Sequence, residues 1–266
     1  MWRKRLIQSA SPESSRIALD LRAPAAYLTL HHPPVNVIDI PMMEELARAL
    51  AEIDARPDLP IVVIQGSASV FSAGVDVAAH TPDKIQEMLT KFHAIMNNLV
   101  TSRKVTIAAV HGHCLGGGAE LAMVCDMVIT SGTATWGFPE IKLACYPPVA
   151  VTALAALIGH KQAADLILTG RSIDGKEAAR IGLATRAVAD AQVAAAVQDS
   201  VNQLSKLSPA ALALTKQAMY HWNAVHFDKG LARAAKIYLE ELMKTEDAQE
   251  GISAFLEKRE PKWKGR

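Results

Sequence analysis

The residue types and runs that are scarce in this 266-residue chain exclude several classes of protein. Cysteine occurs three times, in apolar surroundings, which is too few for the disulfide framework of a secreted domain. No hydrophobic run reaches the roughly 18 residues of a membrane-spanning helix. Lysine plus arginine (28) almost balance aspartate plus glutamate (27), so no net charge favours nucleic acid or an anionic membrane as the main partner. Aromatic residues make up 5%, so we expect a core of Ala, Val, Ile and Leu.

The N-terminal segment MWRKRLIQSASPESS is basic but has no apolar central stretch, so it is not typical of a secretory signal. It is also too short for a transit peptide, and acidic residues such as Asp20 follow it too soon. We therefore expect a cytoplasmic protein. In that reducing compartment Cys114, Cys125 and Cys145 are expected to be free thiols of the core.

The hydrophobic pattern predicts an α/β fold in which short strands alternate with helices over the first 200 residues. Strands are predicted at residues 16–21, 25–30, 61–64, 105–110, 126–130 and 133–138, and helices at residues 41–55 and 82–101. After about residue 149 the pattern is almost wholly helical, with helices predicted at 149–158, 161–168, 192–206, 209–222 and 228–244. We place a core with the active site in residues 1–200 and a C-terminal helical region in residues 201–266. The apolar stripes of that region predict packing on a neighbouring subunit, with coverage of the same core as the alternative.

The most informative motif is HGHCLGGGAEL, from His111 to Leu121, between an apolar strand and an apolar helical run. Glycine permits a sharp turn or the close approach of a ligand, and a helix N-terminus offers free N–H groups to an anion. A phosphate loop would need Lys and Ser or Thr after the glycines, whereas this chain has Glu120, whose carboxylate would repel phosphate. The motif therefore favours a polarised carbonyl beside an acid or base. Taken alone, Glu120 also fits an ordinary first-turn glutamate favoured by the helix dipole.

Two further segments contain candidate site residues near the ends of strands. FSAGVD, residues 71–76, contains Gly74, where the backbone could turn its N–H groups inward. WGFPE, residues 136–140, puts a second carboxylate, Glu140, at the end of a strand. Taken alone, Glu140 would be an ordinary loop glutamate, and the triple glycine an ordinary turn.

The cluster of His111, His113 and Cys114 does not predict a metal site. Alternate residues of a strand point to opposite faces, and no complementary pair of ligands lies nearby in the sequence. His113 or Cys114 could line a pocket or simply pack.

In this order and spacing, the pieces resemble the crotonase (enoyl-CoA hydratase/isomerase) superfamily over nearly the whole chain, from about Arg16 to Lys264. The matching pieces are PPVNVID, FSAGVDV, HGHCLGGGAELAMVCDMVI, WGFPEIKL, LTGRSIDGKEAARIGL and EGISAFLEKREPKWK. The resemblance implies a spiral of ββα units, a C-terminal helical region used in oligomerisation, and homotrimers that often pair into homohexamers. It also implies an acyl-CoA substrate, with CoA as part of that substrate, no separate cofactor and no metal.

The resemblance implies that two backbone N–H groups, which fall at Val75 and Gly117, hold the thioester oxygen. Donors oriented in advance stabilise the enolate oxyanion that forms, and loss of one can cost ~3 kcal/mol. Hydratases of the superfamily use two glutamates, which match Glu120 and Glu140. Two carboxyl groups that flank one water can deprotonate it and protonate the carbon alpha to the thioester, provided that their proton affinities differ. We assign Glu120 to the water and Glu140 to the proton; reversed or shared roles stay open.

The resemblance further implies contacts with the substrate or its CoA. Phe255 and Lys258 match positions that contact the CoA nucleotide, often across a subunit boundary, and the alternative is an ordinary helix with an exposed lysine. Asp76 belongs to the same binding region, with a structural rather than a catalytic role expected. The other expected contacts are Pro34, Val35, Ala73, Gly74, Gly116, Tyr146 and Pro147.

Two departures from the pattern of short-chain hydratases bear on the substrate. Residues 142–149, KLACYPPV, stand where those proteins have a glycine-rich stretch beside the acyl pocket, so Tyr146 and the rigid Pro147–Pro148 pair should reshape it. Small residues at 77–79 replace a lysine that can reach CoA phosphates. With FSAGVDV and HTPDK, the PEIKL-x3-PP pattern looks most like cyclohexa-1,5-diene-1-carbonyl-CoA hydratases, which act in anaerobic aromatic degradation.

We therefore expect a hydratase, a lyase, for a conjugated enoyl- or dienoyl-CoA thioester, with cyclohexa-1,5-diene-1-carbonyl-CoA as the expected substrate. The enzymatic alternatives are a general short-chain enoyl-CoA hydratase and a double-bond isomerase, and two retained glutamates argue against the isomerase. A non-catalytic scaffold usually loses a catalytic glutamate or an oxyanion glycine, and this chain keeps both. RNA binding is not indicated, because no Lys/Arg cluster is interleaved with aromatic residues.

Overall fold

The computed structural model describes residues 15–67 and 69–266, and only the backbone of residues 221–225, so the expectation drawn from the N-terminal segment lies outside the described residues. Within them the strands form a six-stranded sheet (β1–β2–β4–β7–β9–β12), a four-stranded sheet (β11–β10–β8–β5) and a two-stranded sheet (β3–β6). The strands are β1 (Ile17–Arg22), β2 (Ala25–Leu30), β3 (Val37–Ile38), β4 (Ile61–Gln65), β5 (Val70–Ser72), β6 (Gly74–Val75), β7 (Val105–Val110), β8 (His113–Leu115), β9 (Met127–Ser131), β10 (Thr135–Gly137), β11 (Ser172–Asp174) and β12 (Arg186–Val188).

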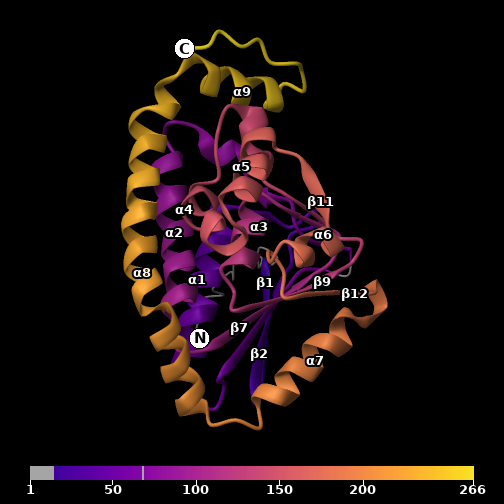
Figure 1. Ribbon diagram of the computed structural model, residues 1–266. Coiled ribbons are helices and arrows are strands. Elements are labelled where there is room, and N and C mark those ends of the chain that lie inside the picture. The colour runs from indigo at the N-terminus through magenta and orange to yellow at the C-terminus, as the bar shows by residue number, and fades with distance from the viewer. Residues whose placement is uncertain (1–14, 68) are drawn as a thin grey trace, which may run out of the picture.

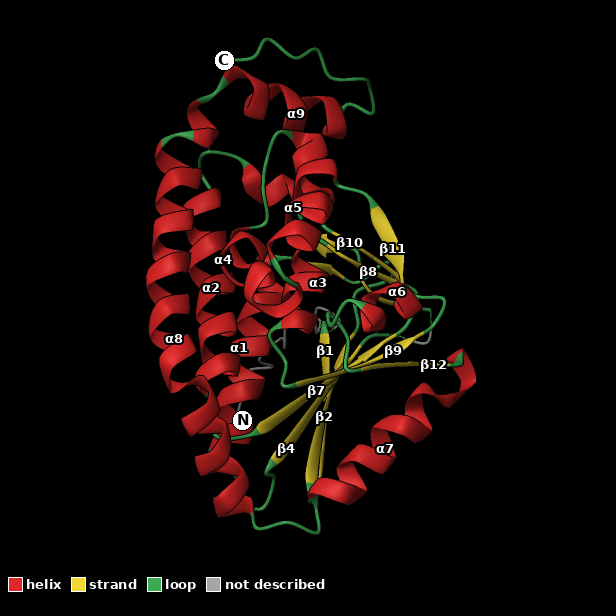
Figure 2. Ribbon diagram, viewed as in Figure 1, coloured by secondary structure: helices red, strands yellow, loops and turns green. Residues whose placement is uncertain are grey.

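Helices cover both faces of the six-stranded sheet (Figure 1; Figure 2). The α-helices are α1 (Ile40–Asp54), α2 (Ile85–Thr101), α3 (Gly117–Met123), α4 (Pro148–Ile158), α5 (His160–Thr169), α6 (Gly175–Arg180), α7 (Val193–Leu204), α8 (Pro209–Glu240) and α9 (Glu246–Leu256). Short 3₁₀ helices are η1 (Val77–His80), η2 (Pro139–Leu143), η3 (Asp190–Gln192) and η4 (Leu242–Lys244).

Successive turns of the chain place one strand in the six-stranded sheet and the next in the four-stranded sheet. The pairs are β4 with β5, β7 with β8, and β9 with β10, and the first two turns lead on to α2 and α3. β4, β7 and β9 run parallel, with Ile61 opposite Val105 and Ile107 opposite Met127. A parallel strand covered on both faces is apolar along most of its length, as the fully buried β7 is, with Thr106 its one polar residue. The structure therefore confirms the predicted α/β spiral of ββα units.

Two apolar clusters stabilise this arrangement. The larger one joins both sheets to α1 and α2, and it buries Leu46, Phe92 and Trp136 completely or almost so. The smaller one lies between the six-stranded sheet and α7, where Ile107 and Val197 belong to one cluster. As expected from the composition, aliphatic side chains make up most of both clusters. Cys114, Cys125 and Cys145 are buried and free.

The predicted elements agree best with the observed structure where a strand or helix has a clear hydrophobic pattern of its own. The predictions at 25–30 and 105–110 coincide with β2 and β7, and those at 41–55 and 82–101 appear as α1 and α2. The predicted break between helices 209–222 and 228–244 is wrong, because α8 runs through it unbroken. Its Phe227, Leu231 and Ala234 recur on one buried face, and Gly230 lets the helix approach Thr152 of α4. The short strands β11 and β12 also interrupt the region expected to be helical, because they add to the edges of sheets formed earlier in the chain.

The long helix α8, in the C-terminal helical region, packs along α2 and α4 of its own chain (Figure 1). Coverage of the same core, the alternative to packing on a neighbouring subunit, accounts for its buried residues such as Leu231 and Tyr238. Leu214 and Met219 of α8 are 57% and 64% exposed, and oligomerisation through such surfaces stays a prediction. Among the described residues, no helix combines the length and apolar character needed to cross a membrane.

Candidate active site

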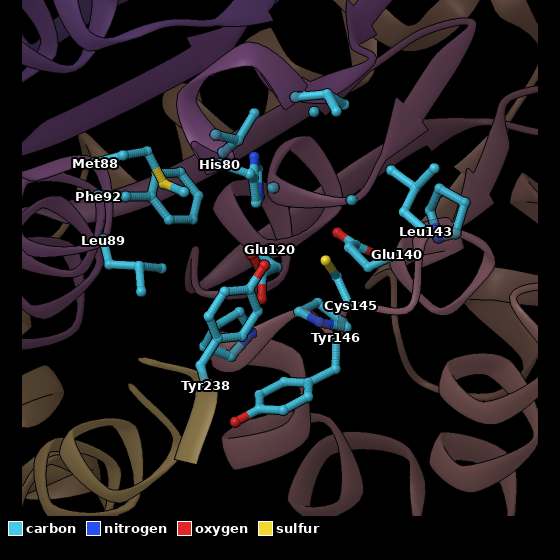
Figure 3. Close-up of a pocket in the computed structure, with 18 of the residues that line it drawn as sticks. His80, Met88, Leu89, Phe92, Glu120, Glu140, Leu143, Cys145, Tyr146 and Tyr238 are labelled. Carbon is cyan, nitrogen blue, oxygen red and sulfur yellow. The ribbon is translucent and has the colours of Figure 1, made fainter. Parts of the chain in front are cut away.

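A cavity of about 90 Å³ lies where the glycine helix α3 meets the loop after β5, helix α2 and the C-terminal helices (Figure 3). Its wall is largely apolar, with Glu120 and Glu140 among the few ionisable groups. The lining residues are Ala73, Gly74, Val75, Val77, His80, Met88, Leu89, Phe92, Gly116, Gly117, Glu120, Pro139, Glu140, Leu143, Cys145, Tyr146, Pro147, Pro148, Tyr238 and Ile252.

The two predicted oxyanion donors, Val75 and Gly117, lie against each other at this cavity. β6 pairs with β3, and Asp76 donates its backbone N–H to the carbonyl of Ile38 in β3. Because successive N–H groups of a strand point to opposite sides, the N–H of Val75 points away from β3. Gly117 starts α3, whose first N–H groups have no partner within the helix. A Cβ on Gly117 would lie 3.3 Å from the nitrogen of Val75 and 2.5 Å from its side chain, so the close approach requires glycine.

Gly116 allows the carboxyl group of Glu140 to reach the cavity. Gly116 has a φ of +51°, which favours glycine, and it caps the N-terminus of α3. A Cβ at this position would lie 2.6 Å from Oε1 of Glu140. Glu140 itself comes from η2, which directly follows β10. The first glycine of the triple therefore makes room for a carboxyl group that is 24 residues away in the sequence (116 to 140).

Glu120 is held by the start of a helix. It is 3% exposed, and its Oε1 accepts hydrogen bonds from the backbone N–H groups of Val149 (2.8 Å) and Ala150 (2.9 Å) in the first turn of α4. Burial raises the pKa of the Glu120 carboxyl, whereas these two amide donors lower it by stabilising the ionised form. Pro147 and Pro148 set the position of these donors, because they lead the chain into α4.

Glu140 has a different environment. Although the residue as a whole is half-buried, its Oε2 is shielded from solvent and accepts no hydrogen bond from the described residues. Burial raises the pKa of Glu140, and the nearby Glu120 carboxyl raises it further, with opposition only from the backbone N–H of Glu140 itself. The two carboxyl groups therefore share a cavity but differ in hydrogen bonding, and the ionised form is favoured more at Glu120.

The structure brings most of the predicted site residues together at one place. Both glutamates and both oxyanion donors line the cavity, and five of the expected substrate contacts line it as well: Ala73, Gly74, Gly116, Tyr146 and Pro147. The other five, which are Pro34, Val35, Asp76, Phe255 and Lys258, are not part of its wall.

These five residues occupy more peripheral places. Asp76 caps η1 by accepting a hydrogen bond from the N–H of Ala78 at 3.0 Å, which agrees with a structural role. Pro34 is exposed and Val35 half-buried before β3. Phe255, 53% exposed, and the exposed Lys258 lie at the end of α9, and their contact with CoA stays a prediction.

Sequence reasoning missed several lining residues, notably His80 and Tyr238. His80 donates from Nδ1 to the carbonyl of Asp76 at 3.1 Å, and burial lowers the pKa of its ring, which favours the neutral form. Tyr238 enters from the last turn of α8, where a buried tyrosine is ordinary core material. His113 is exposed and Cys114 packs in the core, and neither lines the cavity. Within the described ranges, no group of three or more His, Cys, Asp or Glu side chains could hold a metal ion.

Comparison with known proteins places these features in context. A family model described as enoyl-CoA hydratase/isomerase matches residues 21–266. The chain is 36% identical over 239 residues to a probable enoyl-CoA hydratase of Mycobacterium tuberculosis, with 89% of this chain and 93% of the relative covered. It is 35% identical to the cyclohexa-1,5-dienecarbonyl-CoA hydratase of Thauera aromatica, with 90% and 92% covered. The crystal structure of an enoyl-CoA hydratase from Mycobacterium avium superimposes with a TM-score of 0.83 at 29% identity, covering 93% of this chain and 98% of the other.

Proposed function

The chain belongs to the enoyl-CoA hydratase/isomerase family, and on that premise we propose that it is a hydratase of a conjugated enoyl- or dienoyl-CoA thioester. The observation that carries the proposal is one apolar cavity in which two solvent-shielded carboxyl groups, Glu120 and Glu140, lie beside the N–H groups of Val75 and Gly117 (Figure 3). Hydration needs a base for water, an acid for carbon and a site for the enolate oxygen. This cavity contains candidates for all three.

The N–H groups of Val75 and Gly117 bind the thioester oxygen in the proposed mechanism. As water attacks, negative charge moves from the double bond onto this oxygen. Backbone donors that are already in place stabilise this charge without the reorganisation that water would need, and one such donor contributes ~3 kcal/mol. The start of α3 adds the positive end of a short helix, which acts in the same direction.

The two glutamates divide the proton transfers. Glu120 accepts a proton from water while the water oxygen bonds to the β-carbon, and the π electrons move to the thioester oxygen. Glu140 then protonates the α-carbon of the enolate. The amide donors on Glu120 favour its ionised form, and Glu140, which receives none from α4, favours its protonated form, so a base and an acid coexist at one pH.

We further propose a cyclic dienoyl thioester, cyclohexa-1,5-diene-1-carbonyl-CoA, as the substrate. The relative from Thauera aromatica that carries this activity in its name supports the choice, as does the wall made by Tyr146, Pro147 and Pro148. Met88, Leu89 and Phe92 of α2 supply an apolar surface suited to a ring. In this diene water attacks the ring double bond that is conjugated with the thioester, and the second double bond, which is attached to the α-carbon, extends the enolate that forms.

A side-by-side turnover assay tests this choice. The purified protein is given crotonyl-CoA or cyclohexa-1,5-diene-1-carbonyl-CoA, and products are identified by mass. We expect addition of one water to the cyclic diene, with crotonyl-CoA a poor substrate. Fast hydration of crotonyl-CoA would instead indicate a general short-chain hydratase, and a shifted double bond without added water would indicate an isomerase.

The remaining proposals concern the setting of the reaction. The acid–base steps use only carboxyl groups and backbone N–H groups, so the proposed reaction needs no metal or separate cofactor. We propose a cytoplasmic homotrimer or homohexamer, in which Phe255 and Lys258 contact the CoA nucleotide, and light scattering coupled to gel filtration measures its mass. Lys258→Ala should raise KM for acyl-CoA and leave kcat within about twofold, the change expected when an exposed ionic contact is lost.

A further inference from the structure

Tyr238 brings a phenol from α8 into the cavity, and neither the motifs nor the family assignment gives it a role. Its side chain is 1% exposed, and its Oη makes no hydrogen bond with any residue in the described part of the chain. Figure 3 shows the side chain leaving α8 and pointing toward the centre of the cavity, where Glu120, Glu140 and Cys145 lie. Buried hydroxyl groups are nearly always paired, so this one requires a partner that the described protein does not provide.

Neighbouring rings fix the position of this phenol. The ring of Tyr146 packs edge-on against Tyr238, with 5.1 Å between centroids and an angle of 83°, and the ring of His80 lies 6.5 Å away. Tyr146 is itself anchored, because its Oη donates to the backbone carbonyl of Ala234 at 2.6 Å. Tyr238 is therefore packed on more than one side, and its Oη has a defined place in the cavity.

The phenol of Tyr238 acts as a neutral hydrogen-bond donor. Burial raises its pKa well above the usual value for tyrosine, and nearby Cys145 and Glu140 add to the effect. The Cys145 thiol is close enough that Tyr238 lowers its pKa, but it does not reach hydrogen-bonding geometry with Oη. The donor is therefore available to a molecule that enters the cavity.

A second polar atom in this cavity is also buried without a hydrogen-bond partner among the described residues. Oε2 of Glu140 is buried and, like Oη of Tyr238, has no hydrogen-bond partner within residues 15–67 and 69–266. The two groups are near enough for Glu140 to influence the pKa of Tyr238. Water both donates and accepts hydrogen bonds, and it is held in a protein interior when two to four polar atoms surround it. Tyr238, Glu140 and Glu120 supply such a set in an otherwise apolar space.

We infer that Tyr238 donates a hydrogen bond to the oxygen atom of the reacting water, and to the hydroxyl that this oxygen becomes in the product. The inference rests on the proposed hydration. One lone pair of the oxygen accepts the bond from Tyr238 while the other attacks the β-carbon. The proton of the water passes to Glu120, Glu140 protonates the α-carbon, and Tyr238 keeps its own proton throughout. Tyr238 thus orients the water and undergoes no chemical change.

If Tyr238 served only to pack the core, its replacement by phenylalanine would leave turnover unchanged. A buried hydroxyl without a partner is less favourable than the phenylalanine that lacks it, because desolvation of the hydroxyl is not compensated. Tyr238→Phe should therefore leave the thermal midpoint unchanged or raise it. A loss of turnover without a loss of stability would separate water binding from packing.

The test compares Tyr238→Phe with Tyr27→Phe, whose phenol bonds to Gln198 at the surface, 3.1 Å away. Steady-state hydration, thermal unfolding and exchange of the α-proton of a saturated acyl-CoA with deuterated solvent are measured for each. Exchange requires the oxyanion donors and a glutamate but no added water. We expect Tyr238→Phe to lower kcat about 3- to 10-fold, with smaller changes in KM and exchange, as for the loss of one hydrogen bond to a neutral oxygen. Tyr27→Phe should match the wild type.

Three results would overturn this role for Tyr238. The first is a kcat of Tyr238→Phe within about twofold of the wild type. The second is a fall in its kcat together with a lower thermal midpoint. The third is an equal loss of hydration and of α-proton exchange in this variant. In each case the wild type still adds water, and only the role of Tyr238 is rejected. If the wild type exchanges the α-proton but hydrates neither crotonyl-CoA nor the cyclic diene, the proposed function fails, and this inference fails with it.

Discussion

The cavity has two walls that are specified in different ways. The wall from the spiral core contains the reacting groups, and each of them follows a strand within a short motif: Val75 in FSAGVD, Gly117 and Glu120 in the glycine helix, and Glu140 in WGFPE. The wall from the C-terminal helices contains Tyr238 and Ile252, which belong to ordinary amphipathic stripes. The comparison indicates that local backbone requirements leave a signature in the sequence, whereas closure of the site depends on tertiary packing.

Replacing either glutamate should have the largest effect on turnover, and it tests whether the core wall contains the reacting groups. Glu120→Gln and Glu140→Gln each keep the shape of the side chain but remove its ability to exchange protons. We expect either change to lower kcat by roughly 10²- to 10⁴-fold, the usual contribution of general acid–base catalysis. Turnover measures the loss, and calorimetry with a product-type acyl-CoA checks that binding survives. Near-normal turnover in either variant would contradict the two-carboxylate mechanism.

Gly116→Ala tests whether the glycine loop positions Glu140. The new Cβ would meet Oε1 of Glu140 at 2.6 Å, and a φ of +51° adds backbone strain of about 1–3 kcal/mol. We expect lower stability and a fall in kcat of about 10-fold or more, as for a displaced catalytic group. Gly159→Ala is the matched control, because Gly159 also has a positive φ (+83°) but nothing within 4 Å of its Cβ position. Equal losses of activity in the two variants would show that strain, rather than contact with Glu140, is responsible.

The pH dependence of stability compares Glu140→Gln with the wild type. The pKa of Glu140 is raised in the folded protein, so the folded state binds more protons than the unfolded chain. Its contribution to stability is therefore present at low pH and is lost as the pH rises from about 4.5 through the raised folded pKa. We expect thermal midpoints of variant and wild type to be similar near pH 5 and the variant to be more stable near pH 9. A constant difference across this range would show that Glu140 is not shifted.

Tyr146→Phe should show the smallest effect, and it tests the connection between the two walls. Tyr146 follows η2 in the core, and its hydroxyl bonds to the carbonyl of Ala234 in α8. Loss of this bond should lower the free energy of unfolding by about 1 kcal/mol. Denaturant unfolding measures it, and Tyr238→Phe, which removes a hydroxyl without a hydrogen bond to the described residues, serves as the comparison. A larger loss in the free energy of unfolding for Tyr238→Phe than for Tyr146→Phe would contradict the conclusion that only the Tyr146 hydroxyl contributes a stabilising hydrogen bond.

Much of the core wall could be predicted from the sequence because its geometry requires particular residues. Gly116 and Gly117 cannot carry a Cβ without meeting Glu140 and Val75, so glycine appears there in the sequence. The parallel strands β4 and β7 could also be predicted, because burial on both faces makes them almost continuously apolar. Contacts set by distant segments left no such signature.

The C-terminal wall illustrates that limit. Whether Tyr238 points into the cavity or into an ordinary core depends on how α8 packs along α2 and α4, and a helical stripe does not encode its partner. The same holds for β11 and β12, which depend on sheet edges built earlier in the chain, and for the uninterrupted course of α8 past Gly230. The two backbone N–H groups that donate to Glu120 could not be predicted either, because they belong to α4, 29 and 30 residues further along the chain.

The most direct test of the central claim is the fate of water during turnover. The wild-type protein and Glu120→Gln are incubated with cyclohexa-1,5-diene-1-carbonyl-CoA in water labelled with heavy oxygen, and the acyl-CoA products are analysed by mass spectrometry. The two-carboxylate account predicts a hydroxyacyl-CoA that carries one labelled oxygen from the wild type and almost none from the variant. A product of unchanged mass with a shifted double bond, or equal labelling by both proteins, would contradict it.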